Sequence, residues 1–253
     1  MAIRQNILRV AAKAGSEGKG AHIASSLSMV EVMTVLITKI MRTHDVFILS
    51  KGHGALAYYA ALKEAGIITD AQLSSFEADG GDFPGQPSKS AENGIVFSSG
   101  SLGMGLSYAC GLALASKRHG YDKMVYVLLG DGELNEGSNW EAVMFAKQYM
   151  LNNLVAVVDF NKMQSDGKTE DILNVDLESV FRSFGWQTYL CDGHSIGELL
   201  AAFSFSENKA PVVILAKTIK GKGVSFMENN TAWHHNRLSN EQYQTAIGEI
   251  DSA

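Results

Sequence analysis

This sequence of 253 residues has little of several features that define other classes of protein. Its two cysteines, Cys110 and Cys191, lack metal-ligand spacing, which argues against a disulfide framework and indicates structural thiols in a reducing compartment. It has no run of lysines or arginines, and a formal net charge of −6 makes a nucleic acid or an anionic membrane a poor partner. No apolar stretch approaches the roughly 20 residues that span a bilayer, and residues 1–10 lack the apolar core of a signal peptide. We therefore expect a cytoplasmic protein with no nucleic acid and no membrane among its partners.

Strand and helix patterns alternate along the chain. Short apolar runs typical of buried strands occupy 46–49, 125–129, 154–160, 186–190 and 212–216. Helical periodicity covers 3–14, 30–41, 55–65, 104–118, 140–149 and 196–205, and Thr69 with Gln72 has the spacing of a capping box. This order predicts an α/β fold in which residues 1–253 form a single domain, a doubly wound, mostly parallel sheet with helices on both faces. The segments 80–105 and 162–175 are expected to be loops, and a loop as long as the first is uncommon unless it lines a site.

Oxygen-bearing residues stand where two predicted strands end. Gly130-Asp131-Gly132 follows one strand and Asn161 follows the next, 161 − 131 = 30 residues after Asp131. That spacing suits one strand–helix–strand crossover, so the two side chains should lie side by side at the carboxyl ends of parallel strands. A carboxylate and an amide oxygen there suit a magnesium-bound phosphate, which the glycines allow to approach the backbone. The simpler alternative is a pair of turn and helix-cap residues.

Three of the seven histidines stand out by their positions. His53 is bracketed by glycines after a strand, where a neutral imidazole can donate to a phosphate oxygen. His22 precedes a helix and His234 lies beside Trp233 in a polar tail, so helix-cap or surface roles remain open for both. The sequence has no Ser-His-Asp signature and no Walker loop, so hydrolysis by a protein nucleophile is poorly supported.

Four segments together resemble the transketolase family. Gly130-Asp131-Gly132 followed by Asn161-Lys162-Met163 is similar to the thiamine-diphosphate motif, which joins a Gly-Asp-Gly turn to a downstream asparagine. Segment 50–54 resembles the family's Ser-x-Gly-His-Gly, segment 100–105 its Gly-Pro-Leu-Gly-Gln-Gly, and segment 215–223 its Lys-Thr-x-x-Gly-x-Gly strand and loop. The similarity runs in the expected order from His22 to His234, and it implies the diphosphate-binding domain of such an enzyme.

The resemblance implies a cofactor and a metal site. Thiamine diphosphate would be bound with Mg²⁺, for which Ca²⁺ or Mn²⁺ can substitute, and the metal ligands would be Asp131, Asn161 and the backbone carbonyl of Met163. The residues implied to contact the cofactor are His53, Gly100, Ser101, Leu102, Gly132, Asn161 and His234.

The resemblance also implies residues that serve the substrate and the reaction. His22 and His234 would face the substrate and assist proton transfers, and Glu136 resembles the acidic residue that links paired active sites across a subunit contact. The chain departs from the family at Gln86, where Pro84-Gly85-Gln86-Pro87 replaces the frequent Pro-Gly-His-Pro. Glutamine can hydrogen-bond a sugar hydroxyl but cannot exchange a proton near neutral pH, so we expect an altered donor preference or a slower proton step.

A second departure concerns the extent of the sequence. In transketolases the glutamate that activates the cofactor lies in a later pyrimidine-binding domain, and this sequence has no such domain. We therefore expect the amino-terminal subunit of a split transketolase, active in an α2β2 heterotetramer with a pyrimidine-domain subunit. It would transfer a two-carbon ketol unit from a ketose or ketose phosphate to an aldose or aldose phosphate. Two alternatives remain open: a related carboligase similar to deoxyxylulose-phosphate synthase, which would use pyruvate, and a non-catalytic partner subunit.

Overall fold

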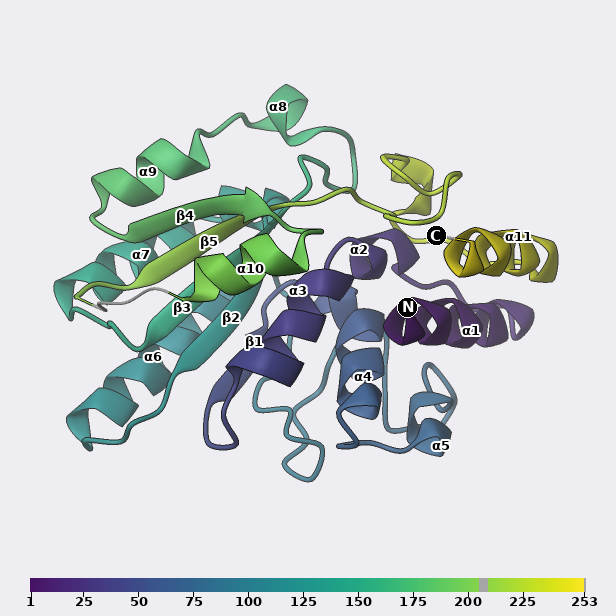
Figure 1. Cartoon of the computed structure of the whole chain (residues 1–253), viewed down its shortest axis with the longest axis horizontal. Helices are drawn as coiled ribbons and strands as arrows, with labels where there is room; N and C mark the ends of the chain where they lie inside the picture. Colours follow the sequence, from purple (N-terminus) through teal and green to yellow (C-terminus); the bar gives the residue numbers. More distant parts are fainter. Residues whose placement is uncertain (205–208, 253) are drawn as a thin grey trace.

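All five predicted strands are present and form one parallel sheet (Figure 1). The computed structural model describes residues 1–204 and 209–252. The strands are β1 (Val46–Leu49), β2 (Val125–Gly130), β3 (Leu154–Phe160), β4 (Gln187–Asp192) and β5 (Val212–Lys217). Their order across the sheet is β1-β2-β3-β5-β4, so β5 lies between two strands that precede it in the chain. The doubly wound parallel sheet expected from the sequence is confirmed.

Side chains alternate along each strand and divide between two cores. Tyr126 and Leu128 of β2 belong to the first core, whereas Val125, Val127 and Leu129 belong to the second. Helices cover both faces of the sheet, which is why the central strands read as continuous apolar runs in the sequence.

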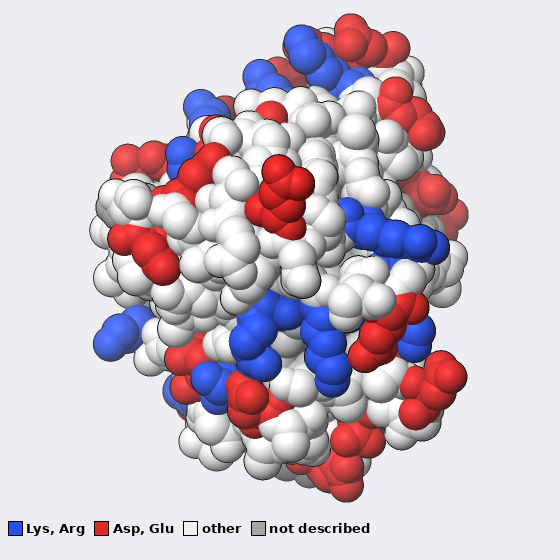
Figure 2. All heavy atoms as spheres, turned by 90° about the vertical axis from the view of Figure 1, so that its right-hand side faces the viewer, with Lys and Arg blue, Asp and Glu red and all other residues white. Residues whose placement is uncertain are grey.

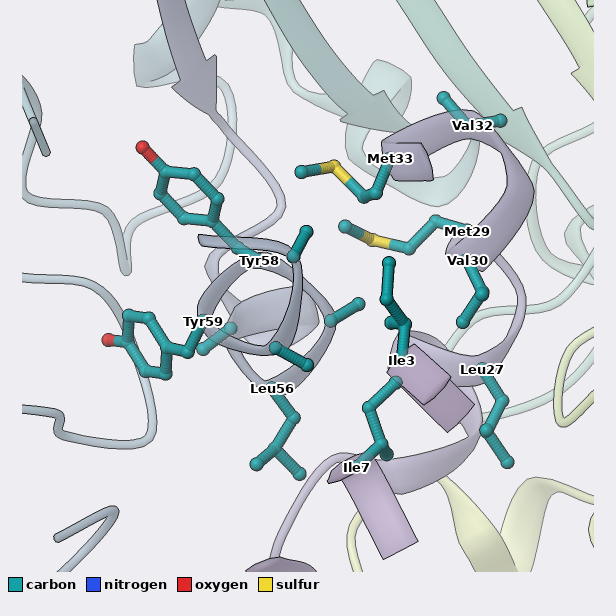
Figure 3. Packing of buried hydrophobic residues seen from close by; sticks show 14 of the residues in the cluster. Ile3, Ile7, Leu27, Met29, Val30, Val32, Met33, Leu56, Tyr58 and Tyr59 are labelled. Carbon is teal, nitrogen blue, oxygen red and sulfur yellow. The ribbon is translucent and has the colours of Figure 1, made fainter. Parts of the chain in front are cut away.

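The first core joins one face of the sheet to a layer of helices. Figure 3 shows part of it, where Ile3 and Ile7 lie among Leu27, Met29 and Leu56. The first and last helices lie side by side, and Gln5 donates a hydrogen bond of 2.8 Å to Asp251, so this layer ties the two ends of the described chain together (Figure 1). The α-helices that contribute described residues to this core are α1 (Ala2–Ser16), α2 (Ile23–Leu27), α3 (Val30–Val35), α4 (Ala55–Glu64), α5 (Asp70–Leu73), α10 (Ile196–Phe203) and α11 (Asn240–Asp251).

The second core joins the opposite face of the sheet to α6 (Met104–Arg118), α7 (Gly137–Gln148) and α9 (Leu177–Ser183). Here a single layer of helices separates the core from the surface, and large apolar side chains of α6 and α7 remain exposed. We call these residues the α6–α7 face; they are Met104, Tyr108, Met144, Phe145 and Tyr149. Large exposed apolar groups clustered on one helix pair are typical of a surface that another chain covers.

Short elements account for most differences from the sequence-based prediction. The predicted helix 30–41 is α3 continued by the π-helical turn η1 (Leu36–Ile40), and the predicted loop 162–175 contains α8 (Thr169–Ile172). The long loop 80–105 is confirmed up to the start of α6, and Thr69 and Gln72 form the expected capping box on α5 (Asp70–Leu73). The predicted helix 196–205 ends at Phe203, and Phe205 lies outside the described residues.

Like α8, the helices α9 and α11 are absent from the sequence-based prediction. Helix α9 has only seven residues, too few for helical periodicity to be recognised. Helix α11 is largely polar and buries only Ala246 and Ile250, but Ser239 and Gln242 form a capping box that marks where it begins.

Two features of the described residues bear on what the surface can contact: the length and polarity of the helices, and the distribution of charge. None of the helices within residues 1–204 and 209–252 is both long and apolar enough to cross a membrane. Figure 2 shows the side of the molecule that lies on the right in Figure 1, and there acidic and basic side chains are interspersed among uncharged ones. That side therefore presents a mixed charged surface, in contrast to the apolar α6–α7 face.

Candidate active site

A cavity of about 280 Å³ opens where β1, β2 and β3 end. Its walls come from the segment after β1, the loop before α6, the turns after β2 and β3, and the chain that follows β5. Parallel strands deliver their carboxyl ends to one edge of the sheet, which is why residues so distant in sequence meet here. A larger cavity of about 340 Å³ lies beside β1 and α4, but its lining is mainly apolar and none of the predicted site residues, all of them described, contributes to it.

Asp131 and Asn161 come together in one hydrogen-bonded turn. The Asp131 carboxylate is buried and accepts hydrogen bonds from the backbone N–H groups of Gly132, at 2.9 Å, and of Lys162. Asn161 Oδ1 accepts from the N–H of Met163 at 3.0 Å. Lys162 adopts the left-handed conformation, with φ of +61°, which bends the chain after β3 back toward β2. The two oxygen-bearing side chains are thus held by backbone N–H groups of the turns that follow β2 and β3.

The donor set of this turn fits a hard divalent cation. Burial, together with the nearby charge of Asp159, raises the pKa of Asp131 to about 7, so a divalent cation beside this carboxylate would stabilise its ionised form. The carbonyl of Met163 accepts no hydrogen bond from the described residues, although Lys162 and Gln164 on either side of it are both bonded to segment 167–169. The described residues contain no cluster of three His, Cys, Asp or Glu side chains suited to a metal. A metal here would therefore be held by carboxylate, amide and carbonyl oxygens, the ligands of Mg²⁺ and Ca²⁺.

A buried ion pair lies directly beneath the cavity. Lys51 follows β1 and Asp159 lies inside β3; the two side chains are 1% and 0% exposed and form a salt bridge. Lys51 also donates to the carbonyl of Ser25 at 3.0 Å, and Asp159 accepts from the hydroxyls of Ser28, at 2.6 Å, and Thr218. Burial works against the charge of Asp159, but Lys51 outweighs it and lowers the pKa of that carboxyl. These contacts link the carboxyl ends of β1, β3 and β5 beneath the cavity.

Three predicted histidines meet at the mouth of the cavity. The ring centroids of His22, His53 and His234 lie 5.2 to 5.7 Å apart, although the residues come from opposite ends of the chain. Burial is the main cause that lowers the pKa of His22 to about 3 and of His234 to about 4, and it lowers the pKa of His53 well below its ordinary value. All three imidazoles are therefore neutral at pH 7 and can each donate and accept a hydrogen bond.

Lys220 fixes the orientation of His234. Its ammonium group donates to the carbonyl of Gln164 at 3.2 Å and lies 2.8 Å from Nδ1 of His234. An ammonium group has no acceptor, so Nδ1 accepts and the imidazole proton is placed on Nε2. Burial, followed by the charge of Lys51, lowers the pKa of Lys220 to about 8. His234 is thus presented as an N–H donor on its free side.

The predicted site residues do not all reach the cavity lining. The predicted site residues that do line it are His53, Leu102, Asp131, Gly132, Glu136, Asn161, Met163 and His234. His22 joins the group through its ring contacts with His53 and His234. Gly100, Ser101 and Gln86 stay outside the lining, and Gln86 Oε1 lies so near that a Cβ on Gly100 would be only 2.9 Å from it. Gln86 therefore closes over the 100–102 turn.

Several polar residues of the site were not singled out from the sequence as site residues. Lys51 and Asp159 carried a signal, since each places a charge at the end of a buried strand. Lys220 lies inside the segment 215–223 that resembles the family, but the resemblance gave it no role. Ser25 and Gln164 gave no signal in the sequence, yet both line the cavity, and Ser25 Oγ is buried without a hydrogen-bond partner. An unpartnered hydroxyl that faces a cavity is typical of a ligand contact.

Comparisons with known proteins assign this fold to a class. The family described as transketolase, thiamine diphosphate binding domain, matches residues 3–248. A relative from Actinobacillus succinogenes, named as a subunit of apulose-4-phosphate transketolase, is 38% identical over 98% of this chain and 93% of its own length. A relative from Clostridium sp., named 6-deoxy-6-sulfo-D-fructose transketolase subunit SqwG, is 38% identical over 94% of this chain and 90% of its own length.

Longer relatives share the same domain. Human transketolase is 38% identical over 98% of this chain, which spans 41% of the human protein. The structure of a transketolase from Leishmania mexicana superposes with a TM-score of 0.88 at 27% identity, again over 98% of this chain and 41% of the longer one. These similarities define a thiamine-diphosphate-binding domain of the transferase class. The chain belongs to the transketolase family.

Proposed function

We propose that this chain is one subunit of a thiamine-diphosphate-dependent transketolase, which transfers a two-carbon ketol unit from a ketose phosphate to an aldose phosphate. The observation that supports it most is the convergence of three oxygen donors, from Asp131, Asn161 and Met163, with three neutral histidines around one cavity. Two relatives are named for a sugar phosphate and a sulfosugar, which favours an anionic sugar as the substrate.

In this proposal the strand ends hold the metal and the diphosphate. Asp131, Asn161 and the carbonyl of Met163 ligate Mg²⁺, for which Ca²⁺ or Mn²⁺ can substitute because they take the same oxygen ligands. The cofactor is contacted by His53, Gly132, Asn161, His234 and the 100–102 turn (Gly100, Ser101, Leu102). When bound, thiamine diphosphate supplies the carbon nucleophile and the electron sink of the reaction.

The chain's own histidines handle the protons. His22 and His234 are neutral at pH 7 because burial lowers their pKa values, so His22 can accept a proton from a substrate hydroxyl or return one, and His234 can donate to a substrate oxygen. His234 presents Nε2–H, since Lys220 occupies its other nitrogen. Gln86 stands where the family often has histidine, and it can orient a sugar hydroxyl without exchanging a proton.

We further propose that the active enzyme is a cytoplasmic α2β2 heterotetramer, in which this chain acts as a single diphosphate-binding domain and a second chain supplies the pyrimidine-binding domain. Two relatives that this chain matches over 90% or more of their length are named as subunits. The helices of the α6–α7 face both begin at the cavity, where Leu102 precedes α6 and Glu136 precedes α7. A chain seated on this face would border the cavity mouth and meet Glu136.

Titration calorimetry tests the cofactor and metal assignment. The co-expressed complex is expected to bind thiamine diphosphate with Mg²⁺ present, to lose that binding when the metal is chelated, and to convert a ketose donor only with the cofactor. This chain alone is expected to show no turnover. Metal-independent binding, or activity of the isolated chain, would contradict the proposal.

Co-purification tests the docking surface. Met144→Asp, on the α6–α7 face, is expected to prevent recovery of the partner chain, because it buries a charge in the contact. Ile67→Asp is the matched control, since Ile67 is equally exposed, at 49%, but lies away from α6 and α7. Equal recovery of the partner with both variants would place the contact elsewhere.

A further inference from the structure

Glu133 is a buried carboxylate that neither the metal site nor the proton steps require. It lies on the 3-10 turn η3 (Gly132–Asn135), directly after β2, and only 2% of the residue is exposed. Burial of a carboxylate costs free energy unless several donors satisfy it. The partners of Glu133 therefore indicate what it is for.

Three donors from three segments converge on this carboxylate. Oε1 accepts from the hydroxyl of Ser50, at the end of β1, and from the N–H of Gly103, at 2.9 Å, in the loop before α6. Oε2 accepts from the N–H of Gly130, at 3.0 Å, at the end of β2. Both backbone donors would otherwise lack partners: β1 ends at Leu49, opposite Leu128, and Gly103 precedes the first turn of a helix. The Glu133 side chain thus supplies acceptors for the backbone N–H groups of both Gly103 and Gly130.

The segments bonded to Glu133 are drawn into unusually close contact. A Cβ on Gly105 would lie 2.3 Å from the hydroxyl oxygen of Ser50, so only glycine fits there. Gly103 is left-handed, with φ of +84°, and its carbonyl accepts from the hydroxyl of Ser138 at 3.0 Å. Both polar backbone groups of Gly103 are therefore held by the chain that follows β2.

We propose that Glu133 is a positioning residue that fixes the 100–102 turn at a set distance from Asp131, so that the cofactor-binding loops are assembled before the cofactor arrives. The proposal rests on the proposed function for the identity of that cofactor. Gly103 follows the turn expected to touch the cofactor, and Gly130 precedes Asp131, the carboxylate expected to hold the metal. The backbone N–H groups of both glycines donate to the side chain of Glu133.

The role requires a carboxylate. Glu133 faces three donors, and a carboxylate offers acceptors on both oxygens, whereas an amide offers only one. In Glu133→Gln the amide NH₂ would point at one backbone N–H and leave it without an acceptor. The shape of the side chain would be kept, so the variant isolates the hydrogen bonds.

Amide hydrogen exchange on the purified chain tests the positioning without the cofactor. Glu133→Gln is expected to speed exchange at Gly103, Gly130 or both by roughly 10- to 100-fold, as expected for loss of a bond to a charged acceptor. The amides of Val127 and Val157, in the strand interiors, should exchange as before. Glu141→Gln, an exposed glutamate of α7, is the matched control and should change none of them. Unchanged protection at both glycines in Glu133→Gln would overturn the proposal.

Cofactor affinity supplies the second readout, measured on the complex with its partner chain. Glu133→Gln is expected to weaken thiamine diphosphate binding by roughly tenfold while the midpoint of thermal unfolding of the cofactor-free complex changes little. If the midpoint falls with no local change in exchange, the role is purely structural and the proposal fails. If Glu133→Gln does not fold, Ser50→Ala provides the test, because it removes one of the three donors. It should give smaller changes in the same exchange rates and in cofactor affinity. Exchange and affinity equal to those of the wild type in Ser50→Ala would overturn the proposal. Failure of the unsubstituted complex to bind the cofactor would refute the proposed function, whereas the exchange experiment tests the positioning by itself.

Discussion

Two polar clusters, each largely shielded from solvent, differ in how completely they are satisfied. The first, the Glu31 cluster, contains Arg4 of α1, Glu31 of α3 and His194 of the loop after β4. Glu31 is bound by the guanidinium and by Nδ1 of His194 at 2.9 Å, and Nε2 of His194 accepts from the N–H of Ile219 at 2.8 Å. The carboxylate and the imidazole at its centre are thus satisfied within the chain.

The second cluster surrounds the cavity, and several of its polar groups are not fully paired within the described residues. Burial raises the pKa of Asp131 to about 7, Ser25 Oγ has no hydrogen-bond partner among the described residues, and three neutral imidazoles lie close to one another beside the cavity. Beneath them, Lys51 and Asp159 pair with each other, and hydrogen bonds with Ser25, Ser28 and Thr218 complete the network. The contrast teaches that buried polar residues alone do not identify a binding site. A network whose polar groups are all hydrogen-bonded stabilises the fold, whereas a network with unpartnered polar groups indicates a ligand site.

The largest expected effect comes from opening the closed pair beneath the cavity. Lys51→Met leaves the charge of Asp159 buried without its partner, which should lower the free energy of unfolding by about 3 to 5 kcal/mol. Chemical denaturation measures it. The double variant Lys51→Met with Asp159→Leu should recover much of the loss, because the uncompensated charge is gone, and failure to recover would show that Asp159 contributes little to the cost.

Removal of the charge expected to hold the metal should affect binding more than stability. Asp131→Asn is expected to weaken Mg²⁺-dependent thiamine diphosphate binding by roughly 100-fold or more, yet to lower the thermal midpoint of the cofactor-free chain much less than Lys51→Met does, because burial already disfavours the charge and only one backbone N–H loses its acceptor. Calorimetric titration and a melting curve measure the two effects. Asp166→Asn, in an exposed part of the same loop system, is the control. A large loss of stability in Asp131→Asn would erase the distinction between the two clusters.

The Glu31 cluster should reveal itself through pH. Burial opposes ionisation of Glu31, but the hydrogen bond from His194 and the charge of Arg4 outweigh it and lower the pKa from 4.5 to about 2. Because the folded-state pKa is the lower one, the stabilisation is complete above pH 4.5 and is lost as the pH falls toward 2; it amounts to about 3 kcal/mol. The difference in unfolding free energy between wild type and Glu31→Gln should therefore shrink across this window. A difference that is constant from pH 6 to pH 2 would contradict the assignment.

The smallest effect is expected at the rim of the cavity. Gln86→His restores the imidazole that the family often has, and it should alter the relative rates with different ketose donors by less than about 100-fold, the lower end of what a positioned general acid or base contributes. Steady-state assays of the complex with several donors measure it. Cofactor affinity should stay the same, since Gln86 lies outside the cavity lining. Unchanged relative rates would show that the amide already serves as well as an imidazole.

Much of this architecture could be predicted from the sequence because its signals are local. Each strand is an apolar run, and Asp131 and Asn161 each follow one, so their proximity needed only the rule for parallel crossovers. The four-residue α8 and the seven-residue α9 were missed because such short helices carry no measurable period.

The rest of the site depends on contacts that no local pattern records. Ser25 meets Lys51, Lys51 meets Asp159, and Glu133 meets Gly103, and each pair joins segments that lie far apart in the chain. Which polar atoms remain unpartnered is known only after all the others have found partners. The pairing of His234 with Lys220 likewise depends on the path of the chain after β5.

The strand order β1-β2-β3-β5-β4 has a consequence for how the chain can assemble during its synthesis. A ribosome delivers β4 before β5, yet β4 pairs only with β5, so it must wait without a neighbour until residues 212–217 emerge. Insertion of β5 between β3 and β4 then completes the sheet, and Lys220 and His234 follow it. The cofactor pocket can therefore form only after nearly the whole chain has been translated, and until then the free edges of β3 and β4 are the surfaces most exposed to mispairing.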